Sequence, residues 1–402
     1  MSSSDSATRV VSGMRPTGRL HLGQYHGVLK NWVKLQYEYD CFFFVADWHA
    51  LTTAYDDTTT IGRHTFDMVV DWLAAGLNPG SSTLFVQSRV PEHAELHLLL
   101  SMITPLAWLE RVPTYKDQIQ KLGDKDLSTY GFLGYPLLQA ADILIYRAGH
   151  VPVGADQVPH VELTREVARR FNHVFGRETG FEELAEAAVA KLGKKASRLY
   201  TESRRAYVEQ GDTEALERAR ALLAGNQNLS IGDVERLYGY LEGGGRIILP
   251  EPQALINEAA RVPGLDGEKM SKSYGNTITL REPPEQVETK IRTMMTDPAR
   301  ARRTDPGDPA NCPVFALHNL YSPPDLLAWA SEGCRSAGIG CVDCKKPLID
   351  AINAEQAQMR ERAAQYEDDP DLVNSILQEG SEAARDVARE TLEDVREAIG
   401  LA

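Results

Sequence analysis

Residues 12–25 read Ser-Gly-Met-Arg-Pro-Thr-Gly-Arg-Leu-His-Leu-Gly-Gln-Tyr and join the first β-rich run of the chain to a helical one. Gly13 and Gly18 allow the backbone to approach a ligand closely, and the helix that follows would direct its free N–H groups at a phosphate. His21 and Gln24 lie three positions apart, so both can donate from the first helical turn. The stretch indicates a nucleotide cradle, although such a turn is also an ordinary connector.

Around this turn, β-rich runs alternate with helical ones from Arg9 to about Asn172. The β-rich runs are residues 10–12, 41–45 and 83–86, and the helical runs between them are residues 22–39 and 62–75. Strands separated by helices of this length usually form a parallel sheet with crossover helices. The sequence therefore predicts an α/β fold, a Rossmann-like doubly wound parallel sheet whose ligands lie beyond the carboxyl ends of the strands.

The pattern divides the chain into four segments. Residues 1–177 and 249–290 would form two parts of one catalytic α/β domain. Between them, residues 178–248 are charged and rich in Ala and Leu, which predicts a mainly helical insertion. From 291 to 402 the pattern is helical, so we expect a C-terminal all-helical domain.

Composition limits the classes of partner. The chain has 402 residues, of which 43% are hydrophobic, enough to bury a large core. A net charge of -14 argues against non-specific attraction to nucleic acid, so RNA contacts would need local basic patches such as Lys345 and Lys346. The first eight residues lack a basic start and an apolar run, and the longest apolar run, residues 41–46, is too short to cross a membrane. We therefore expect a cytoplasmic protein that binds neither DNA nor a membrane.

A second motif spans residues 267–276, Gly-Glu-Lys-Met-Ser-Lys-Ser-Tyr-Gly-Asn. Two lysines and two serines between glycines suit a loop that closes over a polyphosphate and opens for release, although the spacing also permits a solvated loop. The string from Lys269 to Ser273 is a signature of class I aminoacyl-tRNA synthetases, and His-Leu-Gly-Gln at 21–24 resembles their other signature. The two motifs occur in the order that is typical of this class.

The segment between the motifs bears on substrate choice. Residues 135–146 are predicted to be a helix with proline in its first turn, which places Tyr135, Gln139, Asp142 and Tyr146 on one face. A carboxylate on an otherwise apolar helix needs a hydrogen-bond donor. The sequence Val-Pro-Val-Gly-Ala-Asp-Gln then offers small apolar walls followed by polar groups. An apolar slot with one acceptor suits an indole, whose only polar group is its N–H.

The same segments resemble bacterial tryptophanyl-tRNA synthetase. The resemblance rests on Tyr-Pro-x-x-x-Ala-Ala-Asp-Ile-Leu from Tyr135 and on Val-Pro-Val-Gly-x-Asp-Gln from Val151. It spans most of the chain, including Val45–Ala50, Gln87–Pro91, Lys116–Asp117, Thr296–Asp297 and the helical tail, which is similar to the anticodon-binding domain of the family.

The resemblance implies an activity. The enzyme would activate tryptophan with ATP and Mg²⁺, release pyrophosphate, and transfer the tryptophanyl group to the terminal ribose of tRNA(Trp). It also implies a homodimer in the cytoplasm. The expected catalytic residues are Lys269, Lys272, Lys116, His21 and Gln24.

The resemblance also implies two ligand sites. The ATP site would comprise Gly13, Met14, Arg15, Thr17, Gly18, His21, Gly23, Gln24, Gly154, Asp156, Lys269, Met270, Ser271 and Lys272. The tryptophan site would comprise Tyr135, Gln139, Asp142, Gln157, Val151, Val153, His49 and Val11, with Asp142 accepting the indole N–H and Tyr135 and Gln157 holding the α-amino group.

Four of the five cysteines gather near the C-terminus, as Cys312-x21-Cys334-x6-Cys341-x2-Cys344. Four thiolates that end in a chelating Cys-x2-Cys pair suit either Zn²⁺ or a [4Fe-4S] cluster, and ligand type alone does not separate the two. A similar spacing, one residue longer in the first gap, occurs in the subset of bacterial tryptophanyl-tRNA synthetases that carries a [4Fe-4S] cluster. The resemblance therefore implies an iron-sulfur cluster, with Zn²⁺ as the alternative.

Three other functions remain open at this point. A tyrosine-specific synthetase shares both signatures, and Asp142 could accept from a phenol. An RNA-binding or redox-sensing paralogue without catalysis would keep the cysteines but would not need Lys269 and Lys272. A small adenylyltransferase would share the cradle, but it would leave the helical tail unexplained.

Overall fold

The computed structural model describes residues 8–112, 129–177, 180–226, 229–256 and 262–401. In this part of the chain, parallel strands form one five-stranded sheet in the order β3-β2-β1-β4-β5. The strands are β1 (Arg9–Met14), β2 (Asp40–Val45), β3 (Ser82–Val86), β4 (His150–Val153) and β5 (Gln253–Ile256). The prediction of an α/β fold with a parallel sheet is confirmed. The chain leaves β1 toward β2 and later returns to its other side as β4, so the switch point lies beside β1.

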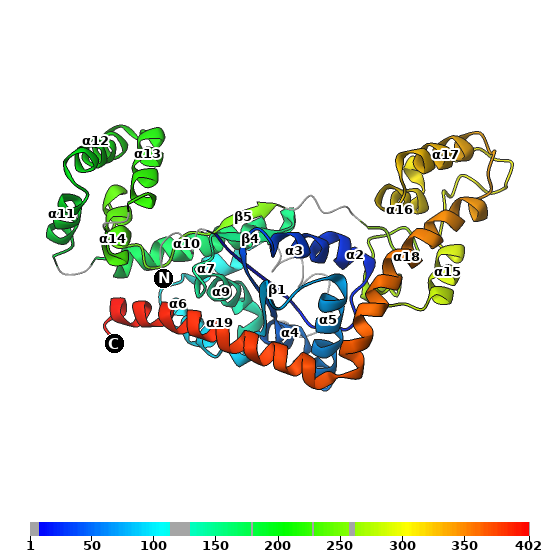
Figure 1. Cartoon of the computed structure of the whole chain (residues 1–402), viewed down its shortest axis with the longest axis horizontal. Helices are drawn as coiled ribbons and strands as arrows, with labels where there is room; N and C mark the ends of the chain where they lie inside the picture. Colours follow the sequence, from blue (N-terminus) through cyan, green and yellow to red (C-terminus); the bar gives the residue numbers. More distant parts are fainter. Residues whose placement is uncertain (1–7, 113–128, 178–179, 227–228, 257–261, 402) are drawn as a thin grey trace.

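Helices cover both faces of the sheet (Figure 1). The strand β2 alternates between two apolar clusters, since Phe43 packs in one and Phe42 and Phe44 pack in the other. The helices of the first cluster's face include α3 (Lys30–Leu35) and α5 (Ile61–Ala75); those of the other include α6 (Glu92–Ser101), α9 (Tyr130–Leu144) and α10 (Val158–Phe175). Burial on both faces explains why β2 is apolar from Cys41 to Val45 rather than alternating in sequence.

Short elements at the carboxyl ends of the strands connect these helices. They are α2 (Leu22–Gln24) and the π-helical turn η1 (Tyr25–Leu29) after β1, α4 (Asp47–Ala54) after β2, η2 (Gln87–Arg89) after β3, and η3 (Ala155–Gln157) after β4. A further short helix, α7 (Leu106–Glu110), follows α6.

The segment expected to be an insertion, residues 178–248, is mainly helical where the structure describes it, and its division from the rest of the chain stays a prediction. It contains α11 (Phe181–Lys191), α12 (Lys194–Gln210), α13 (Thr213–Ala224) and α14 (Ile231–Leu241). These helices share a small core of their own that includes Tyr200 and Leu237, and the hydroxyl of Tyr200 donates to the Leu237 carbonyl over 2.5 Å. They stand at one end of the molecule, away from the sheet (Figure 1).

The C-terminal region is also helical, as predicted. It comprises α15 (Pro284–Thr293), η5 (Pro309–Asn311), α16 (Pro313–Tyr321), α17 (Pro324–Arg335), α18 (Cys341–Asp368) and α19 (Pro370–Ile399). The first helices lie at the end of the molecule opposite the insertion, whereas α19 runs back beneath the sheet toward it (Figure 1).

The helix α19 packs on the edge strand β3. Gly380 approaches the carbonyl of Leu84 so closely that a Cβ at this position would lie 1.9 Å from the oxygen. Further along the helix, Ala384, Ala388 and Leu392 join the apolar cluster that contains Phe42 and Phe44. The last thirty residues therefore complete the cover of the sheet, and the expected domain boundaries at 177, 248 and 290 stay a prediction.

Among the residues that the structure describes, no helix is both long enough and apolar enough to cross a membrane.

Candidate active site at the carboxyl ends of the strands

The turn after β1 and the segment after the second motif pair with each other. The Leu22 N–H donates to the Ile278 carbonyl over 3.0 Å, and the Leu280 N–H donates to the Leu20 carbonyl over 3.0 Å. His21 caps the short helix α2, and its own N–H donates to the Gln24 side chain over 3.3 Å. Two signatures that lie about 250 residues apart in sequence are thereby brought to one place.

Lys272 joins the two motifs directly. Its ammonium donates to the Thr17 carbonyl over 2.9 Å, to the Thr17 hydroxyl over 3.1 Å and to the Gly18 carbonyl over 2.9 Å. Burial lowers the pKa of Lys272 to about 8, against the attraction of Asp71 and Asp67. The cation is thus held by neutral oxygens at the rim of the cradle, where a phosphate would offer it stronger partners. Lys269 is exposed.

Asn276 fixes the shape of the second motif. Its carbonyl oxygen accepts the Ser271 N–H over 2.8 Å, and its amide donates to Asp266 over 2.8 Å and to the Lys269 carbonyl over 3.2 Å. A Cβ at Gly264 would lie 2.2 Å from the Asn276 amide nitrogen, so a glycine is needed there. Sequence reasoning gave Asn276 no role, and its place at the end of the motif was the only available signal.

The charge of the cradle affects His21. Burial, followed by the positive charges of Lys272 and Lys269, lowers the pKa of His21 to about 4. The imidazole is therefore neutral at physiological pH and can act as a hydrogen-bonding group rather than a cation. A Cβ on Gly23 would lie 3.0 Å from this ring and 3.4 Å from the Cβ of Met270, which explains the glycine in the first signature.

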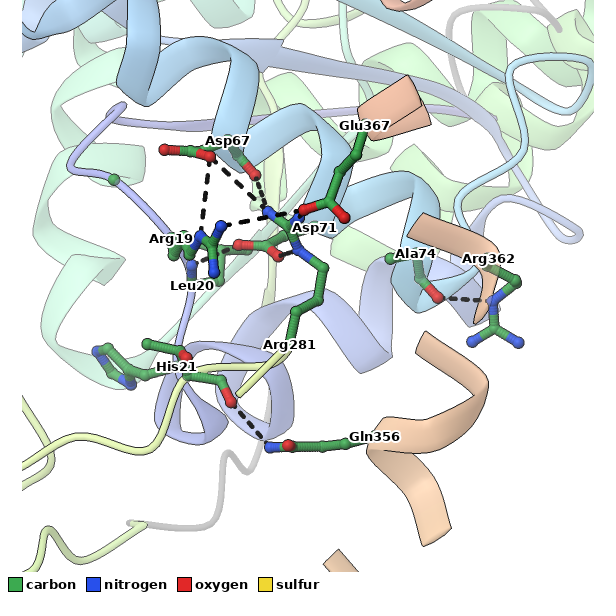
Figure 2. Close-up of polar contacts among 12 residues, drawn as sticks. Arg19, Leu20, His21, Asp67, Asp71, Ala74, Arg281, Gln356, Arg362 and Glu367 are labelled. Atoms are coloured by element: carbon green, nitrogen blue, oxygen red, sulfur yellow. Dashed lines mark hydrogen bonds and ion pairs between the residues drawn. The ribbon is translucent and has the colours of Figure 1, made fainter. Parts of the chain in front are cut away.

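A buried ion pair braces both motifs against the neighbouring helices, and we call it the Asp71–Arg281 brace (Figure 2). Asp71 on α5 accepts the Leu20 N–H over 2.6 Å and the Arg281 Nε–H over 2.6 Å. Arg281 also pairs with Glu367 of α18, and Arg19 lies 3.9 Å from the same carboxylate. The turn after β1, the segment after the second motif and α18 therefore meet at one buried arginine.

The predicted specificity helix is α9, and Asp142 is 1% exposed within it. Its Oδ1 accepts from Gln87 Nε2 over 2.8 Å and lies 2.6 Å from His93 Nδ1, while its Oδ2 lies 2.8 Å from His49 Nε2. Burial alone would raise the pKa of Asp142, but the hydrogen bonds from His49 and His93 outweigh it and hold the pKa well below its ordinary value. The expected donors are present, and His49 is one of them.

Sequence reasoning missed His93 and gave Gln87 no role. Both follow β3, at the same carboxyl edge of the sheet that Met14 and Val45 reach at the ends of β1 and β2. A polar residue directly after a buried strand was a usable signal for Gln87. His93 is the second residue of α6, where no periodicity reveals which buried group it faces.

The other predicted tryptophan-site residues lie around the same edge. Val11, Val151 and Val153 are buried in one apolar cluster with Ala140 and Ala141 of α9. The remaining three are partly buried: Tyr135 and Gln139 lie on α9, and Gln157 ends η3. The ring of Tyr135 lies 5.7 Å from that of His160.

The other predicted ATP-site residues cluster in two places. Gly13 lies against the ring of Phe44, and a Cβ at position 13 would come within 2.4 Å of that ring. Gly154 and the exposed Asp156 open η3, and Gln157 donates to Asp156 over 3.3 Å. Met14 is partly buried and Arg15 and Thr17 are exposed in the turn after β1, while Ser271 is partly buried in the second motif. Lys116 lies outside the described residues.

Burial raises the pKa of the Cys344 thiol to about 12, and the charges of Cys312, Cys334 and Cys341 add to the effect, so the four C-terminal cysteines lie near one another. Among the described side chains, however, no group of three or more His, Cys, Asp or Glu residues is arranged to hold a metal ion. The metal prediction is therefore not confirmed.

The neighbouring Lys345 does not form the RNA contact that its charge suggested. Its ammonium is buried and donates to the carbonyls of Arg292 over 2.8 Å and Met294 over 2.6 Å. Its role in this arrangement is to hold the chain after α15, and Lys346 remains exposed beside it.

The structure brings the two signature motifs together and surrounds Asp142 with donors at the same edge of the sheet. The sequence matches the family model of the class I tRNA synthetases (W and Y) over residues 3–194 and 227–355. The chain belongs to this family of aminoacyl-tRNA ligases.

Within that class, the chain falls among the tryptophan–tRNA ligases. The tryptophan–tRNA ligase of Ralstonia nicotianae is 67% identical over 393 residues, which are 98% of each chain. The tryptophan–tRNA ligase of Thermotoga maritima is 45% identical over 395 residues, which are 98% of this chain and 99% of the other. Among solved structures, the tryptophanyl-tRNA synthetase of Campylobacter jejuni in complex with ADP and tryptophan matches with a TM-score of 0.73 and 29% identity, over 98% of this chain and 100% of that one. The resemblance drawn from the motifs is confirmed.

Proposed function

We propose that this chain activates tryptophan with ATP and transfers it to tRNA(Trp). The observation that carries the proposal is the meeting of both signatures at Lys272, at the edge of the sheet where Asp142 offers an acceptor. The relatives named tryptophan–tRNA ligase support the choice of substrate.

In the first step, a carboxylate oxygen of tryptophan attacks the α-phosphorus of ATP. The bond from that phosphorus to the bridging oxygen breaks, and pyrophosphate leaves with the electron pair. Mg²⁺ would be held by the phosphates and would neutralise part of their charge. Lys272 and Lys269 would bind the leaving pyrophosphate, and neutral His21 would donate to the α-phosphate.

In the second step, a hydroxyl of the terminal tRNA ribose attacks the acyl carbon, and AMP leaves. The protein supplies position and charge rather than a covalent intermediate. Withdrawal of Lys272 from the carbonyls of Thr17 and Gly18 toward the phosphates would couple loop closure to nucleotide binding.

The pocket chemistry favours an indole over a phenol. Val151 and Val153 provide apolar walls, and Asp142 provides an acceptor whose other hydrogen bonds come from the protein. Tyr135 and Gln157 would hold the α-amino group, and Gln139 would line the pocket.

A homodimer in the cytoplasm is the assembly and location that we propose. Leu98 and Met102 on α6, Leu106 on α7 and Tyr130 on α9 are exposed by 54%, 72%, 56% and 68%. Large apolar side chains gathered on adjoining helices favour a protein interface. A second copy of the chain would cover them.

We also propose that Cys312, Cys334, Cys341 and Cys344 bind a [4Fe-4S] cluster with a structural role; Zn²⁺ is the alternative. The thiols are close enough for their charges to interact. The support for the cluster is the spacing of the four cysteines, which resembles that of the cluster-bearing synthetases.

The test is ATP–pyrophosphate exchange on protein purified without oxygen, with tryptophan, tyrosine or phenylalanine, together with the iron and zinc content of the same sample. Exchange with tryptophan alone supports the function, and about four iron atoms per chain support the cluster. Exchange with tyrosine alone, or with none of the three, would overturn the function. Zinc without iron would overturn the cluster.

A further inference from the structure

A buried polar network surrounds Asp142, and three of its members have no assigned role in the reaction: Gln87, His93 and Tyr146. All three side chains are fully buried. They come from three separate places, η2, α6 and the residue pair after α9. Gln87 and His93 contact Asp142, and Tyr146 contacts His93; polar groups withdrawn from water in this way need a reason beyond packing.

We propose that His93 and Gln87 are positioning residues that hold Asp142 as an ionised acceptor, with only Oδ2 left to receive the N–H of the amino-acid substrate. The proposal rests on the proposed function, because it concerns how the same pocket selects an indole.

The hydrogen bonds account for the acceptor capacity of Asp142. An ionised carboxylate can accept about four hydrogen bonds, two at each oxygen. Gln87 and His93 fill Oδ1, at 2.8 Å and 2.6 Å, and His49 fills one position of Oδ2, at 2.8 Å. One position on Oδ2 is left among the contacts of the described residues. A ligand with a single N–H donor completes the set.

The direction of the protons in the network follows from the two contacts of the His93 ring. His93 Nε2 lies 2.7 Å from the Tyr146 hydroxyl, and burial raises the pKa of Tyr146 well above its ordinary value, so that this hydroxyl keeps its proton. Nδ1 of His93 carries a proton and donates to Asp142, because an ionised carboxylate only accepts, and the Tyr146 O–H can then donate to Nε2. The opposite tautomer would set a ring lone pair against a carboxylate oxygen at 2.6 Å.

Ion pairs with α19 hold α6, the helix that carries His93, in place. Glu92, the residue before it, pairs with Arg385 of α19 over 2.7 Å, and Glu95 pairs with Arg396 of α19 over 2.6 Å. The ring of His93 also packs near those of Phe44 and Phe85. The imidazole is therefore fixed by its helix and its surroundings as well as by the carboxylate that it orients.

Removal of a donor has two consequences. First, Oδ1 loses a hydrogen-bond partner, so the carboxylate can rotate. The orientation of Oδ2 toward the N–H of the ligand is then no longer fixed. The ionised form of Asp142 is also less favoured, so its pKa rises, and the protonated acid presents its own O–H where the indole N–H should donate. Both consequences weaken recognition of the N–H specifically, and neither affects binding of the phosphates.

The experiment compares tryptophan with benzothienylalanine, in which sulfur replaces the indole N–H. The measured quantity is the ratio of the two kcat/KM values in ATP–pyrophosphate exchange. His93→Leu removes both contacts of the ring, His93→Asn keeps a donor near the Nδ1 position, Gln87→Met removes the second donor without changing volume much, and Tyr146→Phe removes the hydroxyl.

We expect the ratio to fall about tenfold or more in His93→Leu and Gln87→Met, chiefly through KM for tryptophan, because each variant loses a hydrogen bond to a charged group. His93→Asn should restore most of the ratio, and Tyr146→Phe should lower it by less. A ratio that stays within twofold of the parent protein in both His93→Leu and Gln87→Met would overturn the proposal.

The pH profile adds a second readout. The titratable groups that face Asp142 are His49 on α4, His93 and His97 on α6, and Tyr146 after α9. In Gln87→Met, all four are retained, so a shift of the acid limb of kcat/KM for tryptophan to higher pH, by one unit or more, reports Asp142 itself. An unshifted limb in this variant would count against the proposal.

Two controls separate the alternatives. Arg281→Met should weaken the fold but leave the ratio unchanged, since the Asp71–Arg281 brace lies outside the Asp142 network. If His93→Leu does not fold, the Gln87→Met ratio and its acid limb decide the matter. If the parent protein fails to use tryptophan at all, the proposed function fails, and this outcome is distinct from a variant ratio that does not change.

Discussion

Asp142 and Asp71 are both aspartates with side chains exposed by 1%, and both accept from more than one donor, but their charges are compensated in opposite ways. Asp71 contacts a guanidinium, whose charge does not titrate, and a backbone N–H of the turn after β1. Asp142 contacts two imidazoles and an amide. One carboxylate is neutralised by a permanent cation, and the other is held by groups without a fixed charge.

The difference relates to what each carboxylate does. A carboxylate that fixes chain segments gains from a strong permanent partner, and Asp71 joins segments 51 and 210 residues away. A carboxylate that must receive a donor from a ligand would be blocked by a bidentate arginine. Weak donors leave Asp142 charged and still able to accept, which makes its surroundings suited to recognition rather than to stability.

The largest effect should follow from Asp142→Asn. The variant keeps the size of the side chain but replaces an ionised acceptor with an amide, so kcat/KM for tryptophan in pyrophosphate exchange should fall about 10⁴-fold. The free energy of unfolding should change little, because no cation loses its partner. If the loss of activity were below tenfold while the fold weakened, Asp142 would resemble Asp71 rather than differ from it.

Arg281→Met tests the other carboxylate. It leaves Asp71 buried without its cation, so the free energy of unfolding in urea should fall by about 3–5 kcal/mol. The matched control is Arg362→Met, which removes a donor to the Ala74 carbonyl at the same junction and leaves no carboxylate unpaired. Equal losses in the two variants would show that the brace acts through packing and not through charge.

Lys272 supplies a third case, a cation held by neutral oxygens. Lys272→Ala should lower the rate of tryptophan activation about 10²- to 10³-fold, because a charge on the pyrophosphate is lost in the transition state. Tryptophan affinity, measured by titration calorimetry without ATP, should stay the same. A parallel loss of affinity would place Lys272 with the pocket rather than with the phosphates.

The smallest effect concerns pH. Because the pKa of Lys272 is lowered to about 8, its ammonium is charged below pH 8 and increasingly neutral above it. We expect kcat/KM for ATP to fall by about tenfold per unit above pH 8, since this quantity reports the free enzyme. The Lys272→Arg variant should lack this alkaline limb. If the limb persists in Lys272→Arg, another group is responsible.

Much of the fold and part of the site follow from the sequence. Alternation of β-rich and helical runs predicts the parallel sheet, and two local motifs predict the cradle and the loop, because their chemistry depends on residues that are near in sequence. An aspartate on an apolar helix predicts a need for donors. The identity of these donors does not follow, because His93 and Gln87 lie 49 and 55 residues from Asp142, and only the packed chain brings them together.

The same limit applies to the brace and to α19. Nothing local in Arg281 indicates a partner 210 residues earlier. The amphipathic pattern of α19 predicts an apolar face but does not indicate which surface that face packs against. The structure shows that α19 packs against β3. Metal binding by the four cysteines was predicted from spacing, and it remains a proposal.

The return of α19 to the edge strand has a consequence for synthesis. Domains usually fold as they leave the ribosome, starting from the N-terminal side. Here β3 is complete once Val86 has emerged, but its cover begins only at Pro370, so the nascent chain carries an exposed strand edge and an uncovered apolar face while almost three hundred further residues are translated. Ribosome-bound chains of this protein would therefore be substrates for chaperones until translation ends.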